Sequence, residues 1–424
     1  MKPPPLAPAP SFTKLEYMFG AILLCYPALL FLVRGGMNGA FFMLTILALF
    51  LLISRKAYKN KLDRADRYFS IAMASGLIAI LLSQLYHHDM IARYFDSDSR
   101  FLLAIPVLLA LRHINIRVLS ILQYAFPLGA IAALTAVLVI NPNVRTYAST
   151  SFMNHIHLGD MALLLGFLSL FSVNWTGRDH LVVKLLKIIG LFARLAISVL
   201  SGARGGWIAT PVFVFVYFRT NGRLLNKFLL VMLSIGVVGL LGYFFIEPIH
   251  QRLWMIYSDL SKFSGGHEDT SIGVRLQLWK AAIHLIAANP VFGVGAAGFA
   301  RAMDGLSASG FITSTAAGYG KGEVHNEILA HTVRFGIFGL ISILAVYFVP
   351  FAIFLRAAQS KIRQQNVAAM MGMCVTLGFF VFGLTVETFD LKMTAAFYSL
   401  TVAVLLAIAT HDKQTQAGAS KKRS

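Results

Sequence analysis

Charged side chains are scarce in this chain. Asp, Glu, Lys and Arg make up 13% of its 424 residues, whereas a soluble globular protein carries about 25%. The mean hydropathy is +0.71, and apolar runs of about 17 to 25 residues recur, the length that spans a hydrocarbon core. The short alternating segments of a spanning barrel are missing. The composition therefore predicts an all-α polytopic membrane protein.

Cysteine is nearly absent too. Cys25 and Cys374 both lie in apolar runs, so the sequence offers no disulfide framework and no Cys-x-x-Cys zinc or redox spacing. Acidic residues are also few, and the formal net charge is +19. We do not take this charge as a nucleic-acid signal, because most Lys and Arg fall in short loops between apolar runs, where they set topology.

The apolar runs predict about twelve transmembrane helices and one long loop. The predicted spans lie near 16–33, 37–54, 69–86, 100–112, 117–140, 158–176, 183–201, 205–218, 227–246, 328–356, 366–386 and 391–410. The fourth is short. We divide the chain into a Pro-rich tail, nine helices, the long loop, three helices and a second tail, at 1–15, 16–246, 247–326, 327–410 and 411–424. No small-residue cleavage site follows the first span closely, so we expect it to be an anchor.

Orientation follows from the basic loops. They all fall on one side if the chain starts inside, and they lie at 55–68, 111–117, 178–187, 219–227, 355–363 and 421–424. We therefore expect cytoplasmic termini and a periplasmic loop 247–326. Basic residues on the opposite side are not explained by topology.

The long loop contains an amphipathic segment, "SIGVRLQLWKAAIHLIAANP". It predicts a helix of about 17 residues that ends at Asn289 and Pro290. Arg275 and Trp279 are four residues apart and share a face. Such a helix could also lie on the membrane surface, with Arg275 reaching lipid phosphates.

Three patterns resemble cofactor sites without the context these need. "GVGAAG" (293–298) lacks the strand and helix of a dinucleotide fold, so we expect a turn. "DSD" (96–98) has no further oxygen ligands nearby for a hard cation. "HIH" (155–157) is spaced poorly for a helix and lies where a loop enters a span. We predict no metal site.

Two arginines lie near the seventh and eighth spans. In "SGARGGW" (201–207), Arg204 precedes two glycines at a helix start, and free backbone N–H groups with a guanidinium form an anion site. The alternative for Arg204 is an interfacial side chain that reaches lipid headgroups. Arg194 lies deep in the seventh span, so it is either functional or part of a buried ion pair with Asp160, Glu387 or Asp390.

Polar residues also open the tenth span, "VHNEILAHTVRFGIFG" (324–339). At about 100° per residue, Glu327, His331 and Arg334 share one face, while glycines at 336 and 339 share the opposite face with His325. We expect the polar face to meet a protein or water-filled interior and the glycines to admit another helix. Asn326 is the predicted N-cap.

These motifs resemble the bacterial O-antigen ligase family, within the O-antigen ligase and polymerase superfamily. Three motifs support the resemblance: His325-Asn326 followed by glycines at 336 and 339, the Ser-x-x-Arg-Gly of "SGARGGW", and "GVRLQLWKAA" followed by "NPVFGVGAAGF". The motifs cover about 50 residues, and the span layout covers most of the chain.

The resemblance implies a GT-C type glycosyltransferase that uses neither ATP nor a metal. It would transfer polysaccharide from undecaprenyl diphosphate to a sugar hydroxyl of lipid A–core, at the periplasmic face of the inner membrane. His325 would be the general base, since a neutral imidazole suits proton abstraction near pH 7. Arg204 and Arg275 would stabilise the diphosphate. Trp279, His331, Arg334 and Arg194 are candidates for substrate positioning.

Three other functions stay open. A polymerase of the superfamily would extend the lipid-linked glycan. A protein O-oligosaccharyltransferase would modify Ser or Thr, although such relatives generally carry extra C-terminal sequence. A secondary transporter would show inverted repeats and broken midplane helices, and we see no clear repeat.

Overall fold

The computed structural model describes residues 12–56, 62–140, 148–203, 205–218, 224–245 and 268–411, with isolated positions between 250 and 265. The described residues form helices and no strand, which confirms the all-α prediction. Seven helical segments are long and apolar enough to cross a membrane. They are α1 (Lys14–Leu32), α2 (Gly36–Ser54), α3 (Arg64–Tyr86), α5 with α6 (Ile116–Leu119, Leu122–Ile140), α15 (Glu327–Ala357), α16 (Arg363–Gly383) and α17 (Lys392–Ala409).

The other predicted spans are helical as well. They are α4 (Arg93–Leu111), α7 (His155–Phe171), α8 (Leu181–Ser201), η2 with α9 (Gly205–Ile208, Ala209–Phe218) and α10 (Leu224–Phe245). The predicted fourth span, near 100–112, lies within a longer helix. α4 has 19 residues and begins at Arg93, because the polar stretch before residue 100 is helical and turns buried Asp98 and Arg100 inward.

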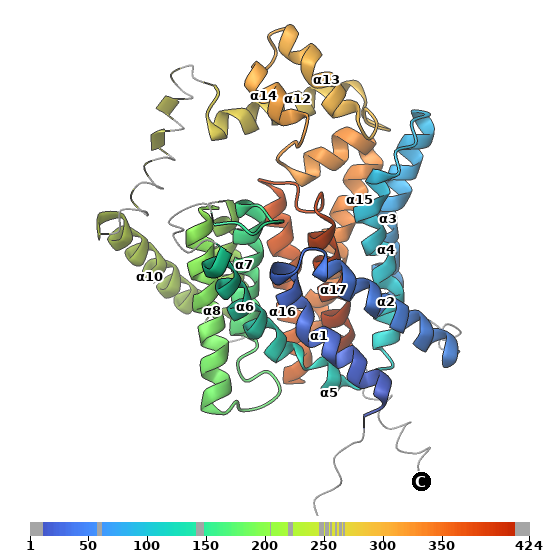
Figure 1. Cartoon of the computed structure of the whole chain (residues 1–424), viewed down its shortest axis with the longest axis vertical. Coiled ribbons are helices and arrows are strands. Elements are labelled where there is room, and N and C mark those ends of the chain that lie inside the picture. Colours follow the sequence, from blue (N-terminus) through green and yellow to red (C-terminus); the bar gives the residue numbers. More distant parts are fainter. Residues whose placement is uncertain are drawn as a thin grey trace, which may run out of the picture.

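The helices pack as one bundle with α16 and α17 at its centre (Figure 1). α17 contacts α4 and α16, while α15 packs between α3 and α16. Outward-facing apolar side chains remain exposed, among them Ile53 at 67%, Ile71 at 68% and Val182 at 77%. Exposed apolar surface of this extent fits contact with lipid. The chain is a multi-pass membrane protein.

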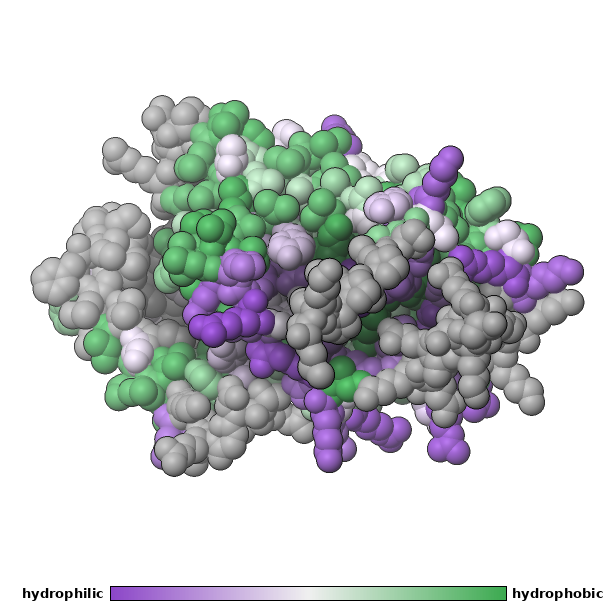
Figure 2. Space-filling view, turned by 90° about the horizontal axis from the view of Figure 1, so that it is seen from below, coloured by the Kyte–Doolittle hydropathy of each residue, from purple (hydrophilic) through white to green (hydrophobic). Residues whose placement is uncertain are grey.

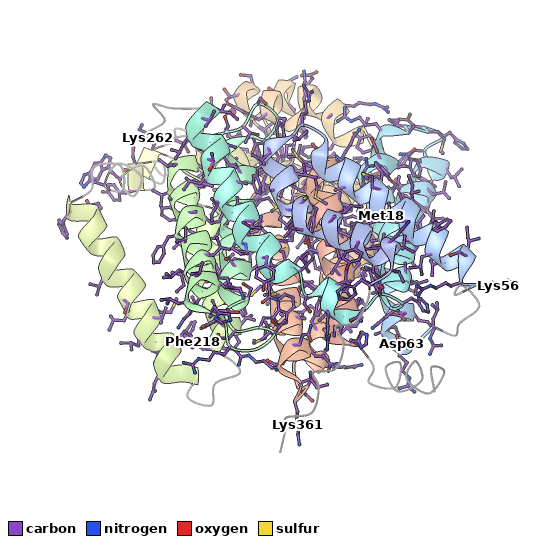
Figure 3. The ribbon with its side chains drawn as sticks, turned by 60° about the horizontal axis from the view of Figure 1, so that its bottom comes forward. Met18, Lys56, Asp63, Phe218, Lys262 and Lys361 are labelled. Atoms are coloured by element: carbon purple, nitrogen blue, oxygen red, sulfur yellow. The ribbon has the colours of Figure 1, made fainter. Side chains whose placement is uncertain are left out.

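Several loops predicted to share one side of the membrane do lie at one end of the bundle. Figure 3 places Asp63, Phe218 and Lys361 toward this end and Lys262 toward the other. Viewed from below, apolar side chains cover much of the upper half of this face, while hydrophilic ones gather across its centre and lower part (Figure 2).

Three helices cap the opposite end of the bundle (Figure 1). They are α12 (Ser271–Ala288), α13 (Gly298–Ala308) and α14 (Ser314–Gly320). α12 starts at the N-cap Thr270 and ends at Asn289, so the predicted amphipathic helix is confirmed. Its buried Leu278 packs in a cluster with Phe299 and Met303. The apolar face of α12 is therefore covered by protein.

Candidate active site

His325 lies in the loop that leads into α15 and is held in an unusual conformation. Its φ is 59°, in the left-handed region that non-glycine residues seldom occupy. Trp279 Nε1 donates to the His325 carbonyl at 3.3 Å, and Glu323 Oε1 lies 3.3 Å from His325 Nδ1. Asn326 then caps α15 by accepting from the N–H of Leu329 at 3.0 Å, as predicted. Strained positions of this kind cluster at functional sites.

The loop between α16 and α17 braces the His325 loop through Glu387. The Glu387 carboxylate forms a bidentate ion pair with Arg334, with N–O distances of 2.5 and 3.1 Å. It also accepts from the N–H of Val324 at 2.6 Å, and the Glu387 N–H donates to Glu323 Oε1 at 2.7 Å. Two carboxylates thus join two loops by reciprocal hydrogen bonds.

Burial acts differently on these two carboxylates. Burial raises the pKa of the Glu387 carboxyl, and the Arg334 guanidinium offsets this only in part. Burial also raises the pKa of the Glu323 carboxyl, but the contact with His325 and the hydrogen bond from the Glu387 N–H outweigh it. The pKa of Glu323 therefore lies below its ordinary value, and Glu323 faces His325 as an anion.

The predicted polar face of the tenth span is confirmed. His331 Nε2 lies 3.1 Å from Glu327 Oε1, and Glu327 Oε2 accepts from the N–H of Phe389 at 2.9 Å and the Thr388 hydroxyl at 3.0 Å. Glu327 is 2% exposed and His331 8%. This face, with Arg334, lines a cavity of about 230 Å³.

The predicted role of the glycine face was wrong. α15 is broken at Gly336, whose φ and ψ are 63° and −148°, so its two halves are not one continuous helix. The segment that approaches is the 290–294 turn, since Ile337 N–H donates to the Pro290 carbonyl at 2.9 Å and Val294 N–H to the Val333 carbonyl at 2.8 Å. A Cβ at residue 336 would collide with the backbone of Val291. The 290–294 turn, whose last two residues begin "GVGAAG", thus packs into the break in α15.

Arg275 lies on the same face of α12 as Trp279. The hydrogen bond from Trp279 to the His325 carbonyl turns this face toward the site. Arg275 Nη1 donates to the Ser271 hydroxyl at 3.3 Å. Arg204, the second predicted diphosphate ligand, lies outside the described residues.

Arg194 makes its contacts away from the His325 loop. It is fully buried, donates to the Gly129 carbonyl, and places its guanidinium 4.2 Å from the Phe31 ring centroid. The alternative of an ion pair with Asp160, Glu387 or Asp390 is wrong, because among the described residues no carboxylate lies within ion-pair distance of Arg194. Glu387 is bound to Arg334 instead.

Sequence reasoning missed Glu323 entirely, although it stands two residues before His325. It also missed that His157 would contact this region: "HIH" opens α7, and His157 Nε2 lies 3.3 Å from the Glu387 carbonyl. The two acids of "DSD" have different surroundings. Asp96 forms ion pairs with Lys392 and Arg100, whereas Asp98 lines the cavity. Among the described residues, no group of three His, Cys, Asp or Glu is arranged to hold a metal ion.

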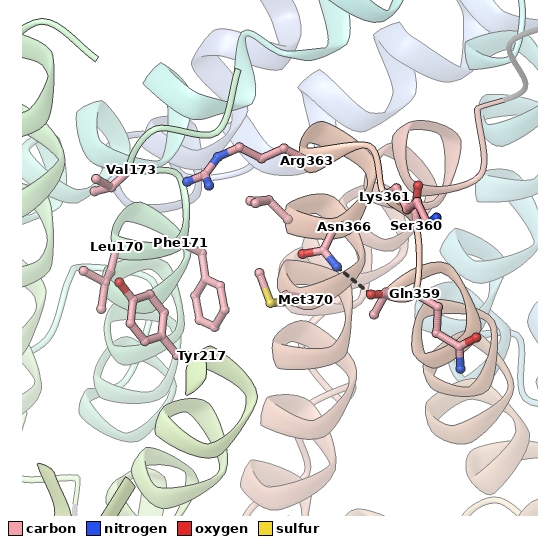
Figure 4. Close-up of a pocket in the computed structure, with 12 residues that line it drawn as sticks. Leu170, Phe171, Val173, Tyr217, Gln359, Ser360, Lys361, Arg363, Asn366 and Met370 are labelled. Carbon is pink, nitrogen blue, oxygen red and sulfur yellow. Dashed lines mark hydrogen bonds between the residues drawn. The ribbon is translucent and has the colours of Figure 1, made fainter. Parts of the chain in front are cut away.

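A larger cavity, of about 550 Å³, lies at the other end of α16. Figure 4 shows Arg363 and Met370 of α16 facing Phe171 and Tyr217 across it. The part of α16 beyond Met370, which lines this cavity, separates it from the loop at 384–391 by about 20 Å. It therefore takes no part in chemistry at His325.

The fold and the site define a polytopic helical membrane protein with a polar site where helix ends meet a helical cap. Residues 188–344 match the family described as O-Antigen ligase. An O-antigen ligase of Escherichia coli is 23% identical over 195 residues, which cover 45% of each chain. An uncharacterized protein of Haemophilus influenzae is 26% identical over 348 residues, 80% of this chain and 86% of that one. These matches support the O-antigen ligase family for the chain.

This family is glycosyltransferase-like, which supports a transferase role for the chain. The matched residues include His325, Glu323, Trp279 and Arg275. Glu387 and Asp98 lie outside the matched residues, so the structure brings parts of the site to this domain from elsewhere in the chain.

Proposed function

We propose that this protein transfers a polysaccharide from undecaprenyl diphosphate to a sugar hydroxyl of lipid A–core. The reaction takes place at the periplasmic face of the bacterial inner membrane, with both termini in the cytoplasm and residues 247–326 in the periplasm. The observation that carries the proposal is the fixed position of His325, held through its carbonyl by Trp279 and beside Glu323 through its imidazole.

His325 is the general base in this proposal. Glu323 lies next to Nδ1, and a carboxylate there favours a proton on Nδ1 and leaves Nε2 free to accept one. Nε2 takes the proton of the acceptor hydroxyl while the hydroxyl oxygen attacks the anomeric carbon. The bond from that carbon to the diphosphate oxygen breaks, and the electron pair leaves with the lipid diphosphate. Direct attack inverts the anomeric configuration.

The leaving diphosphate gains negative charge as its bond breaks, so it needs cations nearby. Arg275 supplies one from the α12 face that points toward His325. Arg204 is the second proposed ligand on the basis of its motif. Arg334 has a different role, because its guanidinium is committed to Glu387 and through Glu387 it supports the His325 loop.

The test is a His325→Ala variant in a strain that lacks its own ligase, with lipopolysaccharide read on a gel. We expect the long-chain ladder to disappear at normal protein level. Glu323→Gln should weaken the ladder and shift the pH profile of transfer in membranes, since the imidazole loses its anionic neighbour. A matched control is Asp304→Asn, which changes a side chain on α13 that is 76% exposed and should leave the ladder intact. A full ladder from His325→Ala would exclude the general-base role.

The wild-type gene in the same strain separates the related functions. Capping of lipid A–core supports the ligase. If lipid A–core stays uncapped while lipid-linked chains grow longer, the protein is a polymerase. If the glycan appears on Ser or Thr of membrane proteins, it is a protein O-oligosaccharyltransferase.

A further inference from the structure

The cavity of about 230 Å³ lies between α4 and the first half of α15 and is bounded by the 384–391 loop; we call it the α4–α15 cavity. Its deepest polar side chains are Asp98, Glu327 and His331, which are 4%, 2% and 8% exposed. Asp98 interacts electrostatically with both of the others. The three groups therefore form one buried polar floor.

Asp98 and His331 both line this floor. Within the part of the chain that the structure describes, the Asp98 carboxylate interacts with its neighbours only electrostatically, and the buried His331 Nδ1 has no hydrogen-bond partner. Glu327 Oε1 lies 3.1 Å from His331 Nε2, which favours a proton on Nε2 and leaves Nδ1 an acceptor. Buried polar groups without partners are costly. A bound molecule would relieve this cost by donating several hydrogen bonds.

The walls add apolar ring faces and a few donors. Tyr94 and Phe335 meet edge to face with centroids 6.4 Å apart, and the Arg334 guanidinium lies 5.9 Å from the Tyr94 ring centroid. Arg93 and Lys392 also line the cavity and are exposed. A cavity of aromatic walls and a few fixed polar groups selects its ligand by orienting donors and acceptors.

Hydroxyl groups on a compact, partly apolar ring match this lining. We propose that the α4–α15 cavity binds one sugar ring, whose hydroxyls donate to the Asp98 carboxylate and to His331 Nδ1. The C–H face of the ring packs against Tyr94 and Phe335. Carboxylates and arginine in one cavity favour a neutral polyol over a phosphate, which the carboxylates would repel.

The position of the cavity suggests what the sugar belongs to. Glu387 lines the cavity, and its carboxylate also binds the N–H of Val324, the residue before His325. A sugar in the cavity would thus lie beside the proposed transfer site. This inference rests on the proposed function, in which the sugar comes either from the donor polysaccharide or from the core oligosaccharide of the acceptor.

The test measures binding to the full chain in detergent by saturation-transfer NMR. The probes are core oligosaccharide freed from lipid A by mild acid and polysaccharide freed from its lipid diphosphate in the same way. We expect one probe to bind the wild type and Asp98→Asn to weaken it at least about tenfold, the loss expected for a hydrogen bond to a charged group. Asp304→Asn should bind like the wild type. The probe that binds Asp98→Asn more weakly than the wild type identifies the source of the sugar.

An unchanged Kd in a folded Asp98→Asn variant would overturn the inference, as would the absence of binding by either probe to a wild type that transfers glycan. If Asp98→Asn shows no cooperative melting, Tyr94→Ala at the partly exposed wall takes its place, with the same expected loss. Failure of the proposed function looks different: the wild type would bind a probe but form no capped lipid A–core.

Discussion

Replacing Gly336 by Ala should destabilise the protein because the break in α15 requires glycine. The backbone there, at φ 63° and ψ −148°, is close to a region that only glycine occupies readily, and strain of this kind costs about 1–3 kcal/mol. The new Cβ would also collide with the Val291 carbonyl. Moving the 290–294 turn would weaken the hydrogen bonds from Ile337 and Val294, each contributing about 1 kcal/mol. We expect a total loss of about 2–6 kcal/mol.

The assay is thermal unfolding of the purified protein in detergent, followed by tryptophan fluorescence. Gly39→Ala is the matched control, because Gly39 lies inside α2 with nothing within 4 Å of an added Cβ. Alanine favours a helix over glycine by up to about 1 kcal/mol, so this control should melt at or above the wild-type temperature. Equal melting of the two variants would refute the reasoning.

Three further predictions concern the residues around His325. Glu387→Ala leaves the mostly buried Arg334 guanidinium, whose side chain is 14% exposed, without its partner, so the free energy of unfolding should fall by up to about 3–5 kcal/mol. Arg334→Leu in the same chain should restore part of this loss, and no restoration in melting curves would argue against the pair as the cause. The low pKa of Glu323 means that its stabilisation is complete at neutral pH and is lost as pH falls through the pKa of the folded protein. The stability difference between wild type and Glu323→Gln should therefore shrink as pH drops below about 4.3, and a difference constant from pH 7 to 3 would contradict this. Trp279→Phe keeps an aromatic ring but removes the hydrogen bond to the His325 carbonyl. The free energy of unfolding should fall by about 1 kcal/mol, and glycan transfer should be slower. Transfer at the wild-type rate would show that this bond does not position His325.

Much of the architecture could be predicted from the sequence because lipid imposes simple rules. Apolar length fixed where helices lie, and each predicted span is helical. Local chemistry fixed several ends, since Asn326 caps α15 and Asn289 ends α12 as their side chains suggest. The polar face of Glu327, His331 and Arg334 followed from helical periodicity alone.

Failures of prediction arose where a contact joins distant segments. Periodicity assumes a continuous helix, so it could not foresee the break at Gly336, which depends on the 290–294 turn. It also could not choose the partner of Arg334, because Glu387 is 53 residues away in sequence. For Arg194 one alternative was an ion pair with an acid, yet the side chain contacts a carbonyl and an aromatic ring.

The sequence by itself determined that this chain is a helical membrane protein, where its helices lie, and which motifs relate it to the O-antigen ligases. These properties depend on hydropathy and on residues close together in the chain. Only the tertiary structure decided that Glu323 and Trp279 hold His325, that Glu387 braces the loop, and that Asp98 faces His331 across a cavity. Such contacts depend on how helices pack, and packing is set by the shapes of many side chains together.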